Sequence, residues 1–582
     1  MNSSCPPVAT AAESPINGAT GSASGERGMQ PATCCPSSPC KPREQRRKTE
    51  RPQLTEYKRA APCPTAAEAG GQPDLHNDLD YLQLVLTARV YDVAIESPLQ
   101  LAKNLSARLA NHIYLKREDL QPVFSFKLRG AYNRMCQLTP EERNRGVIAC
   151  SAGNHAQGVA LAASKLGIQA TIVMPKGTPS IKVNSVWNLG GNVVLHGSDF
   201  DEARQECERL SEEGQLAIIH PYDDVYVIAG QGTVGMEIVR QLQDPKLHAV
   251  FCSVGGGGLI SGVSAFIKRV RPEVKVIGVE AEGADAMAVS LQRGERTRLR
   301  EVNIFADGAA VSIPGEKTFQ ICQRFVDEVV VVTNDEICAC IKDVFEDTRS
   351  ILEPAGALSV AGIKKYIHRE GAKDNVFVGI TSGANMDFNR LRFVAERAEL
   401  GEHREALLSV VIPETPGSFR ELYSLIHPRP ITEFSYRYSD PQNARIFLAF
   451  LVTDRQIEVE EVIASLLAKG MKAMDLSNNE MAKCHARYLA GGRSPSVSNE
   501  RLLRFVFPER PGALQRFLNS LAIGWNVSLF HYRNLGADYG RVLAGIQVPP
   551  EEGKAFQQFL EELGYYYVDE SSNPVYFKEF LL

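Results

Sequence analysis

The stretch HAVFCSVGGGGLISGVSAFIKRV, residues 248–270, decides the fold class. It begins with an apolar run, continues through four consecutive glycines at 255–258, and ends in a helical pattern. The uncharged part, 249–267, is long enough to cross a bilayer, but four glycines would interrupt a spanning helix and instead suit a tight turn. We therefore predict a strand, a turn and a helix in a protein that does not cross a membrane.

The same alternation of strand and helix extends toward the N-terminus. We predict strands at 147–150, 170–175, 191–197 and 216–221, and helices at 155–166, 180–189 and 200–214. Strands that alternate with helices imply a parallel sheet covered on both faces, and hence the α/β class. Ligands of such sheets bind at the carboxyl ends of the strands, so the loops that directly follow strands are the expected place for chemistry.

Composition excludes several other classes of protein. The chain has 582 residues, 44% of them hydrophobic, and a net charge of -5, as is typical of a soluble protein with several domains. Mild acidity argues against an extended nucleic-acid surface. The 13 cysteines form neither CxxC pairs nor a regular spacing, which excludes a disulfide framework or a zinc module. We expect no nucleic-acid partner and a reducing compartment.

Residues 1–75 differ from the rest of the chain. They are rich in Ser, Ala, Pro, Thr and Gly and lack a sustained apolar period, which predicts disorder. Basic residues gather between Lys41 and Arg51, and an apolar core of a secretory signal is missing. The segment is either an imperfect organelle transit peptide or a plain disordered tail.

An internal repeat marks the C-terminal part. LLSVVIPETPGSFREL at 407–422 matches LLRFVFPERPGALQRF at 502–517, and FSYRY at 434–438 matches FHYRN at 530–534. Each copy is typical of a small α+β module: a strand, a Pro-Gly turn, a helix, a strand, and a further strand and helix. We expect four segments, at 1–75, 76–400, 401–494 and 495–582.

Four loops carry the candidate chemistry: VFSFKLRGAYN (123–133), SAGNHAQG (151–158), GGGGL (255–259) and TSGAN (381–385). The glycine loop follows a strand and opens a helix, so its backbone N–H groups can converge on an anion such as a phosphate. Taken alone, a glycine run is equally compatible with a flexible tight turn. None of the four loops contains a carboxylate that could act as an acid.

Lys127 is the candidate nucleophile. Its neighbours Phe126, Leu128 and Ala131 would desolvate the amine and favour its neutral form, which can form a Schiff base. The alternative is a surface lysine beside Arg129 whose apolar stem lies along a helix. A phosphate loop together with a reactive lysine points to pyridoxal phosphate (PLP).

Together these motifs resemble those of the biosynthetic threonine dehydratases, fold-type II PLP enzymes that are similar in fold to the tryptophan synthase β subunit. The resemblance covers residues 80–582 and includes DLSNNEMAKCHARYLAGGR at 475–493, which is similar to the family's regulatory region with its tandem ACT-like modules. Two stretches are most similar to the sequences of the fungal members: VIACSAGNHAQG (147–158) and LFHYRNLGADYGRVLAGI (529–546).

The resemblance implies a role for each matching residue. Lys127 would be the Schiff-base lysine and the general base, Phe126 would lie beside the cofactor ring, and Asn154 would bond its phenolic oxygen. Ser382 would face the pyridine nitrogen, where a neutral hydroxyl suits elimination better than transamination. The phosphate would be held by Gly255, Gly256, Gly257, Gly258 and Leu259, and the substrate carboxylate by Ser151, Gly153, Asn154 and His155.

The implied reaction converts L-threonine to 2-oxobutanoate and ammonia, the committed step toward isoleucine. L-Serine should also react, because a pocket separates two substrates that differ by one methyl group by only about 1–3 kcal/mol. A serine dehydratase is the rival within the same class. From another class, the chain could be an amino-acid sensor that retains an inactive enzyme fold.

This chain differs from related enzymes at two positions, and each difference excludes one property of those relatives. The racemases of this fold carry a serine where this chain has Ala152, which has no proton to give, so racemisation is not expected. The same relatives bind a divalent ion through a glutamate and a downstream aspartate. Here Glu280 and Ala284 are present but Ala286 occupies the aspartate position, so the oxygen ligands are too few for Mg²⁺ or Ca²⁺ and we expect either a monovalent ion or no metal.

Three further side chains have ordinary roles in this interpretation. His155, at a helix N-terminus where its protonated form is disfavoured, is expected to be structural or to orient the substrate rather than to act as an acid. Cys150 and Cys252 end strands and are expected to be buried as small apolar groups.

The duplicated tail predicts regulation. Effector sites of the amino-acid-binding modules that it resembles lie where strand and turn meet, which makes Tyr436, Tyr438, Tyr532 and Arg533 the candidates. The alternative is that the Pro-Gly pairs only form turns and the tyrosines only pack. The resemblance implies inhibition by isoleucine, antagonism by valine, a homotetramer, and a mitochondrial location, with a plastid or the cytoplasm as alternatives.

Overall fold

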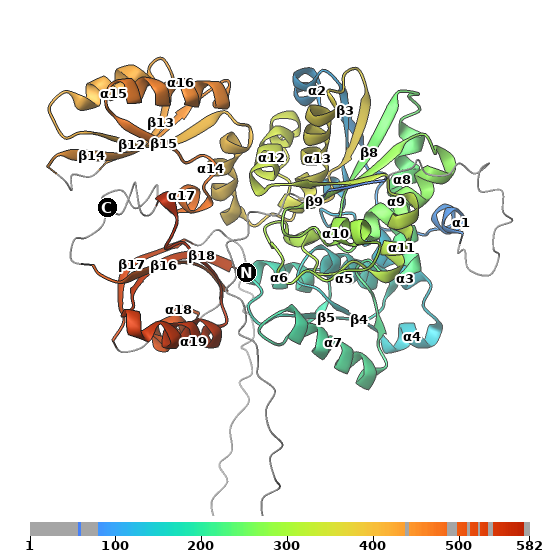
Figure 1. The fold of residues 1–582 in the computed structure, drawn as a ribbon. Coiled ribbons are helices and arrows are strands. Elements are labelled where there is room, and N and C mark those ends of the chain that lie inside the picture. Colours follow the sequence, from blue (N-terminus) through green and yellow to red (C-terminus); the bar gives the residue numbers. More distant parts are fainter. Residues whose placement is uncertain are drawn as a thin grey trace, which may run out of the picture. The chain divides into compact units, whose positions relative to one another are not determined.

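The computed structural model describes residues 56–59, 80–436, 441–485, 497–508, 513–521, 524–533 and 539–575 (Figure 1). The α/β class is confirmed: one mainly parallel sheet and one parallel sheet form the first part, and two antiparallel sheets with helices form the tail. Among the helices in these ranges, none combines the length and the apolar character needed to span a bilayer.

The larger sheet has seven strands in the order β1-β10-β9-β8-β11-β3-β2. Its five central strands run parallel, and the edge strands β1 and β2 pair antiparallel. The strands are β1 (Tyr57–Lys58), β2 (Leu99–Leu101), β3 (His112–Lys116), β8 (Leu247–Ser253), β9 (Lys275–Ala281), β10 (Glu328–Val332) and β11 (Val376–Ile380).

Helices cover both faces of this sheet because successive strand residues point to opposite sides. In β8, Ala249 and Phe251 join one buried cluster, whereas Val250 and Cys252 join the other. The first cluster includes residues of α2 (Lys103–Leu109), α12 (Asn334–Thr348) and α13 (Pro354–Glu370). The second includes residues of α8 (Val225–Gln241), α9 (Gly258–Val270), α10 (Ala286–Arg293) and α11 (Glu316–Phe325).

The smaller sheet has four parallel strands: β6 (Asn192–Leu195), β5 (Ala170–Met174), β4 (Val147–Cys150) and β7 (Ala217–Ile218), in that order. One face packs on α3 (Lys127–Cys136), α5 (Asn154–Leu166) and α6 (Ser180–Asn188), and the other on α7 (Phe200–Gly214). Strand β7 is shorter than the predicted 216–221, because the chain turns at His220, whose Nδ1 accepts hydrogen bonds from the backbone N–H groups of Tyr222 and Asp223.

The remaining elements of this part are α1 (Tyr81–Leu86), α4 (Pro140–Arg145), and the 3₁₀ turns η1 (Glu118–Leu120), η2 (Asp307–Ala309) and η3 (Phe388–Arg390). Helix α14 (Leu391–Gly401) leads from it to the tail.

The repeat appears as two modules with the same order of elements. The first has β12 (Glu405–Pro413), α15 (Ser418–Ile426), β13 (Ile431–Tyr436), β14 (Asn443–Leu451), α16 (Arg455–Ala468) and β15 (Lys472–Asp475). The second has β16 (Glu500–Pro508), α18 (Ala513–Ser520), β17 (Asn526–Arg533), β18 (Tyr539–Gln547), α19 (Gly553–Leu563) and β19 (Tyr566–Asp569). Their sheets have matching orders, β13-β14-β12-β15 and β17-β18-β16-β19.

Sequence reasoning missed the last strand of each module, because KAMD and YYVD are too short to show a period. The predicted turn before α15 is present: Gly417 caps the helix with a φ of 102°, in the left-handed region that favours glycine. In the second module, residues 509–512 of the matching turn lie outside the described residues.

One short part of the segment expected to be disordered is structured. Tyr57 and Lys58 form the edge strand β1, and Tyr57 packs against a core cluster of the larger sheet. Pairing with β10 supplies the hydrogen bonds that the local composition could not predict. Apart from residues 56–59, residues 1–75 lie outside the described residues.

Candidate active site

A pocket opens at the carboxyl ends of β8 and β11, facing the loop that follows β4. This is the edge at which parallel sheets bind ligands. It brings together residues from all four predicted loops, and the glycine loop lines it along its whole length. Its lining consists of Phe126, Lys127, Asn154, Tyr222, Ser253, Gly255, Gly256, Gly257, Gly258, Leu259, Gly308, Ala309, Glu353, Ala355 and Ser382.

The glycine loop joins β8 to α9 and approaches its neighbours too closely for side chains. A Cβ atom on Gly256 would lie 2.3 Å from Cγ of Tyr222, and one on Gly255 would lie 2.9 Å from the backbone of Ala309. Thr318 Oγ1 donates a 2.6 Å hydrogen bond to the carbonyl of Gly256, which fixes the loop. Because α9 begins at Gly258, its first N–H groups have no partner within the helix and suit an anion such as a phosphate.

Lys127 is the first residue of α3 and lies half-buried at the pocket. Its Nζ donates a 3.0 Å hydrogen bond to the carbonyl of Pro221 and lies 5.5 Å from the centre of the Phe126 ring. Burial lowers the pKa of Lys127 to about 8, although the nearby Glu353 carboxylate opposes the shift. A much larger fraction of Lys127 is therefore in the neutral amine form than in an ordinary lysine. The position of Lys127 at the pocket and its hydrogen bond to Pro221 argue against the surface-lysine alternative.

This pKa gives a test that needs no cofactor. At pH 8 about half of Lys127 should be neutral, against roughly one molecule in 300 for an ordinary lysine. Labelling of the cofactor-free protein with dinitrofluorobenzene should therefore modify Lys127 with a midpoint near pH 8. Mass spectrometry of the peptide that contains Lys127 measures this midpoint. A midpoint near that of an ordinary lysine, about 10.4, would contradict the desolvated site.

Asn154 and Ser382 both have fixed hydrogen-bond partners. The Nδ2 of Asn154, the first residue of α5, donates to Oε1 of Glu353 at 2.6 Å. Ser382 accepts a 3.0 Å hydrogen bond from Ser253 and donates one of 3.2 Å to the carbonyl of Ala355. Ser382 thus places a neutral hydroxyl at the pocket, as the sequence predicts. Its two hydrogen bonds, to Ser253 and Ala355, fix its orientation.

The loop after β4 presents the predicted carboxylate-binding residues. Ser151 and Gly153 are half-buried, and Ser151 Oγ accepts a 3.3 Å hydrogen bond from the N–H of Gly153 at the start of α5. His155 is buried and its Nε2 lies 2.7 Å from the carbonyl of Ile219. Burial, reinforced by Lys127, lowers the pKa of His155 to about 3, so the ring is neutral and donates to Ile219. This agrees with a structural or orienting role.

Sequence reasoning missed Glu353 and Tyr222. Glu353 precedes α13 and is only 5% exposed, and burial together with the charge of Asp307 raises its pKa to about 7. A carboxyl group therefore does line the pocket, contrary to what the four motifs indicate. Tyr222 lies against the glycine loop and shares an edge-to-face contact with His220 at 4.7 Å. Neither residue belongs to a motif, and only the folding of distant segments brings them to the site.

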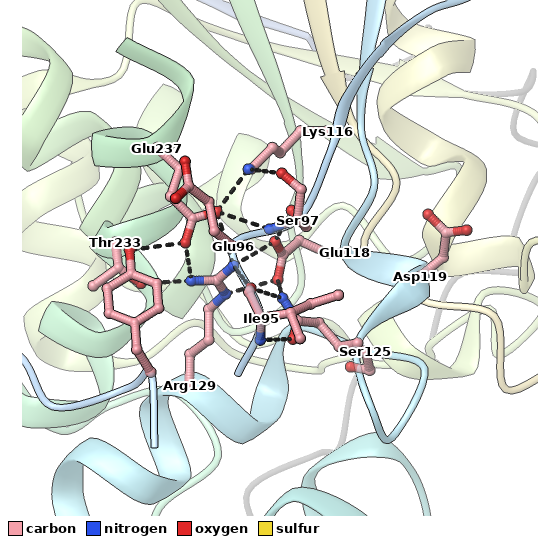
Figure 2. Close-up of polar contacts among 12 residues, drawn as sticks. Ile95, Glu96, Ser97, Lys116, Glu118, Asp119, Ser125, Arg129, Thr233 and Glu237 are labelled. Atoms are coloured by element: carbon pink, nitrogen blue, oxygen red, sulfur yellow. Dashed lines mark hydrogen bonds and ion pairs between the residues drawn. The ribbon is translucent and has the colours of Figure 1, made fainter. Parts of the chain in front are cut away.

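Arg129, two residues after Lys127 in α3, belongs to a fully buried cluster of ion pairs (Figure 2). Arg129 pairs with Glu118 at 2.8 Å and with Glu237 at 2.6 Å, and Lys116 pairs with Glu237 at 2.6 Å. Two positive and two negative charges balance within the cluster. It ties the start of α3 to the end of β3, to η1 and to α8, and so fixes the position from which Lys127 enters the pocket.

The other predicted residues are placed as follows. Strand β13 ends at Tyr436, and β17 ends with Tyr532 and Arg533; the side chains of these three residues are not described. Tyr438 lies outside the described residues.

Both oxygens of the buried Glu280 accept hydrogen bonds from backbone N–H groups at the start of α10, from Met287 at 3.0 Å and Ala288 at 2.8 Å. Burial raises the pKa of the Cys150 thiol to about 12 and that of Cys252 further, which agrees with inert apolar roles.

Comparison with known proteins gives the same picture for both the catalytic part and the tail. The sequence profile described as a pyridoxal-phosphate dependent enzyme matches residues 90–383. The profile described as the C-terminal regulatory domain of threonine dehydratase matches twice, at 396–486 and 491–581.

Relatives match over most of their length. The mitochondrial threonine dehydratase of Saccharomyces cerevisiae is 57% identical over 515 residues, which cover 86% of this chain and 89% of the relative. The biosynthetic L-threonine dehydratase of Burkholderia multivorans is 55% identical over 500 residues, covering 85% of this chain and 98% of the relative. The solved processed form of threonine deaminase isoform 2 from Solanum lycopersicum is 54% identical with a TM-score of 0.54, covering 55% of this chain and 92% of that chain.

Proposed function

The chain belongs to the family of biosynthetic threonine dehydratases, and from this premise we propose how its pocket deaminates L-threonine and how its tail regulates that reaction. The reaction is the PLP-dependent conversion of L-threonine to 2-oxobutanoate and ammonia. The observation that carries it is the meeting of Lys127 and the glycine cradle in one pocket.

The residues present fit the cofactor. The cradle at Gly255, Gly256, Gly257 and Gly258 would hold its phosphate, because any side chain there would clash and the helix start favours an anion. Phe126, Asn154 and Ser382 would contact its ring, and Lys127 would bind it covalently. When bound, pyridoxal phosphate supplies the electron sink that makes the Cα proton of an amino acid removable.

Lys127 then acts as the general base. About half of its amine is neutral at pH 8, and a neutral amine can take the Cα proton of threonine. The loop of Ser151, Gly153 and Asn154, at the start of α5, would receive the substrate carboxylate through backbone N–H groups. The neutral Ser382 leaves little stabilisation for a long-lived carbanion, which favours loss of the β-hydroxyl over transamination.

The regulatory part is joined to the catalytic part by buried ion pairs. Arg397 of α14 binds Asp335 of α12 at 2.5 Å and Glu480 at 2.7 Å. Glu480 lies in the short helix α17 (Glu480–Cys484) and also binds Arg541 of the second module. Lys483 closes the network on Asp335 at 2.7 Å. A change in either module therefore has a direct polar route to α12.

We infer that isoleucine is the inhibitor and valine its antagonist, and that both act through the tail. Tyr436, Tyr438, Tyr532 and Arg533 remain the proposed contacts, since they lie at the ends of β13 and β17 or just beyond. Inhibition requires that isoleucine bind the less active state more tightly than the active one.

One experiment tests both the activity and its control. The full chain with PLP and L-threonine should form 2-oxobutanoate, and isoleucine should suppress this reaction. A chain that ends at residue 400 should keep turnover and lose the suppression, because the ion pairs from Glu480 and Lys483 to the catalytic part are gone. Absent turnover with cofactor bound would favour the sensor alternative, and suppression that survives the deletion would contradict control by the tail.

Three finer features belong to the same proposal. L-Serine should be a second substrate, since one methyl group is worth only about 1–3 kcal/mol of discrimination. We propose a homotetramer in solution, which light scattering would measure. We also propose a mitochondrial location, supported by the name of the S. cerevisiae relative and by the basic N-terminal segment.

A further inference from the structure

Three distant segments meet at the side chain of Asn154. Asn154 opens α5, Asn385 lies in the loop after β11, and Glu353 precedes α13. Asn385 Nδ2 donates to Oδ1 of Asn154 at 2.7 Å, and Asn154 Nδ2 donates to Oε1 of Glu353 at 2.6 Å. The Asn154 amide is thus held at both ends by groups that are far from it in sequence.

The direction of this chain of hydrogen bonds is set by the backbone. Asn385 Nδ2 also donates to the carbonyl of Val123 at 2.9 Å. A carbonyl can only accept, so the group of Asn385 that faces Val123 and Asn154 must be its NH₂. Asn154 must then turn its oxygen toward Asn385 and its NH₂ toward Glu353. A main-chain carbonyl therefore decides which way the Asn154 amide points.

Glu353 is held in place for this role. A Cβ atom on Gly383 would lie 2.5 Å from Glu353 Oε1, and one on Gly308 would lie 3.3 Å from the same oxygen. Two glycines thus enclose the carboxyl group that Asn154 contacts. One N–H of the Asn154 amide is used by Glu353, and the second is left for a ligand of the pocket.

We propose that Asn385 and Glu353 are positioning residues that orient the Asn154 amide so that it donates an N–H to the phenolic oxygen of the bound cofactor. The inference rests on the proposed function, because it takes the ligand of the pocket to be pyridoxal phosphate. Asn385 itself does not line the pocket among the described residues, so its effect must pass through Asn154.

A double-mutant cycle separates positioning from a merely structural role. Asn385→Leu should weaken cofactor binding about tenfold, the loss expected for one well-placed hydrogen bond, and should shift the visible absorption band of the bound cofactor. In an Asn154→Ala background the same substitution should change the dissociation constant less than about twofold. Titration of the cofactor-free protein with pyridoxal phosphate measures all four constants.

Two further variants keep the test decisive. Asn385→Asp has nearly the same size but replaces the donor by an acceptor, so it should weaken binding at least as much even if the leucine variant folds poorly. Asn389→Leu, in the exposed turn η3, should leave binding unchanged. Equal losses from Asn385→Leu with and without Asn154, or no loss at all, would overturn the proposal. A wild-type protein that binds no cofactor would instead overturn the proposed function.

Discussion

Replacing Arg129 by Met should lower the free energy of unfolding of the catalytic part by about 3–5 kcal/mol, the usual result of breaking a buried ion pair from one side. Arg129 is 0% exposed and donates to both Glu118 and Glu237 (Figure 2). Its removal would leave two buried carboxylates with Lys116 as their only cation within the cluster. Desolvated charge without a partner is the source of the cost.

The measurement can be restricted to the catalytic part. The chain has two tryptophans, Trp187 in α6 and Trp525 in the second module. Urea unfolding followed by Trp187 fluorescence, in a background where Trp525 is replaced by Phe, reports on the catalytic part alone.

Arg209→Met is the matched control for the buried cluster. Arg209 lies on the surface of α7 and pairs with Glu206 and Glu213, where water screens the charges. Its loss should leave the unfolding midpoint nearly unchanged. If the two arginine variants unfold at the same urea concentration, the buried cluster contributes no more than a surface pair, and the proposed fixing of α3 would fail with it.

The sequence predicted best what depends on neighbouring residues. The strand, glycine turn and helix at 248–270 form β8, the cradle and α9, because alternation, glycine content and helical period are all local signals. Strand β7 is shorter than predicted, because its end depends on the hydrogen bonds that His220 accepts in the following turn. Strand β1 was not predicted, because it depends on pairing with β10. The strand ends are therefore the least predictable part of the fold.

The residues of the candidate site also differ in whether local sequence could predict them. Lys127, Asn154, the glycines and Ser382 sit in motifs that a family resemblance can match. Glu353 lies outside these motifs, and Asn385 ends the TSGAN motif (381–385) without a predicted role; both gain their importance from hydrogen bonds across 199 and 231 residues to Asn154. No pattern in a single sequence shows that such positions meet, so only the folded chain reveals the support of the Asn154 amide.

Replacing Lys127 by Ala should reduce the turnover of L-threonine at least about a thousandfold, because it removes both the covalent attachment of the cofactor and the base that takes the Cα proton. Borohydride treatment of the wild-type protein should fix the cofactor to the peptide that contains Lys127, and the variant should release it. Lys165→Ala, an exposed lysine at the end of α5, is the control and should keep full turnover.

A small amine can separate the two roles of Lys127. The alanine variant leaves space where the buried amine stood, beside the carbonyl of Pro221. Ethylamine added at alkaline pH, where part of it is neutral, should restore a fraction of proton removal without restoring the covalent attachment. Rescue that rises with the neutral amine concentration would identify the missing group as a base. Turnover within tenfold of wild type in the unrescued variant would contradict the assignment, since no other described lysine lines the pocket.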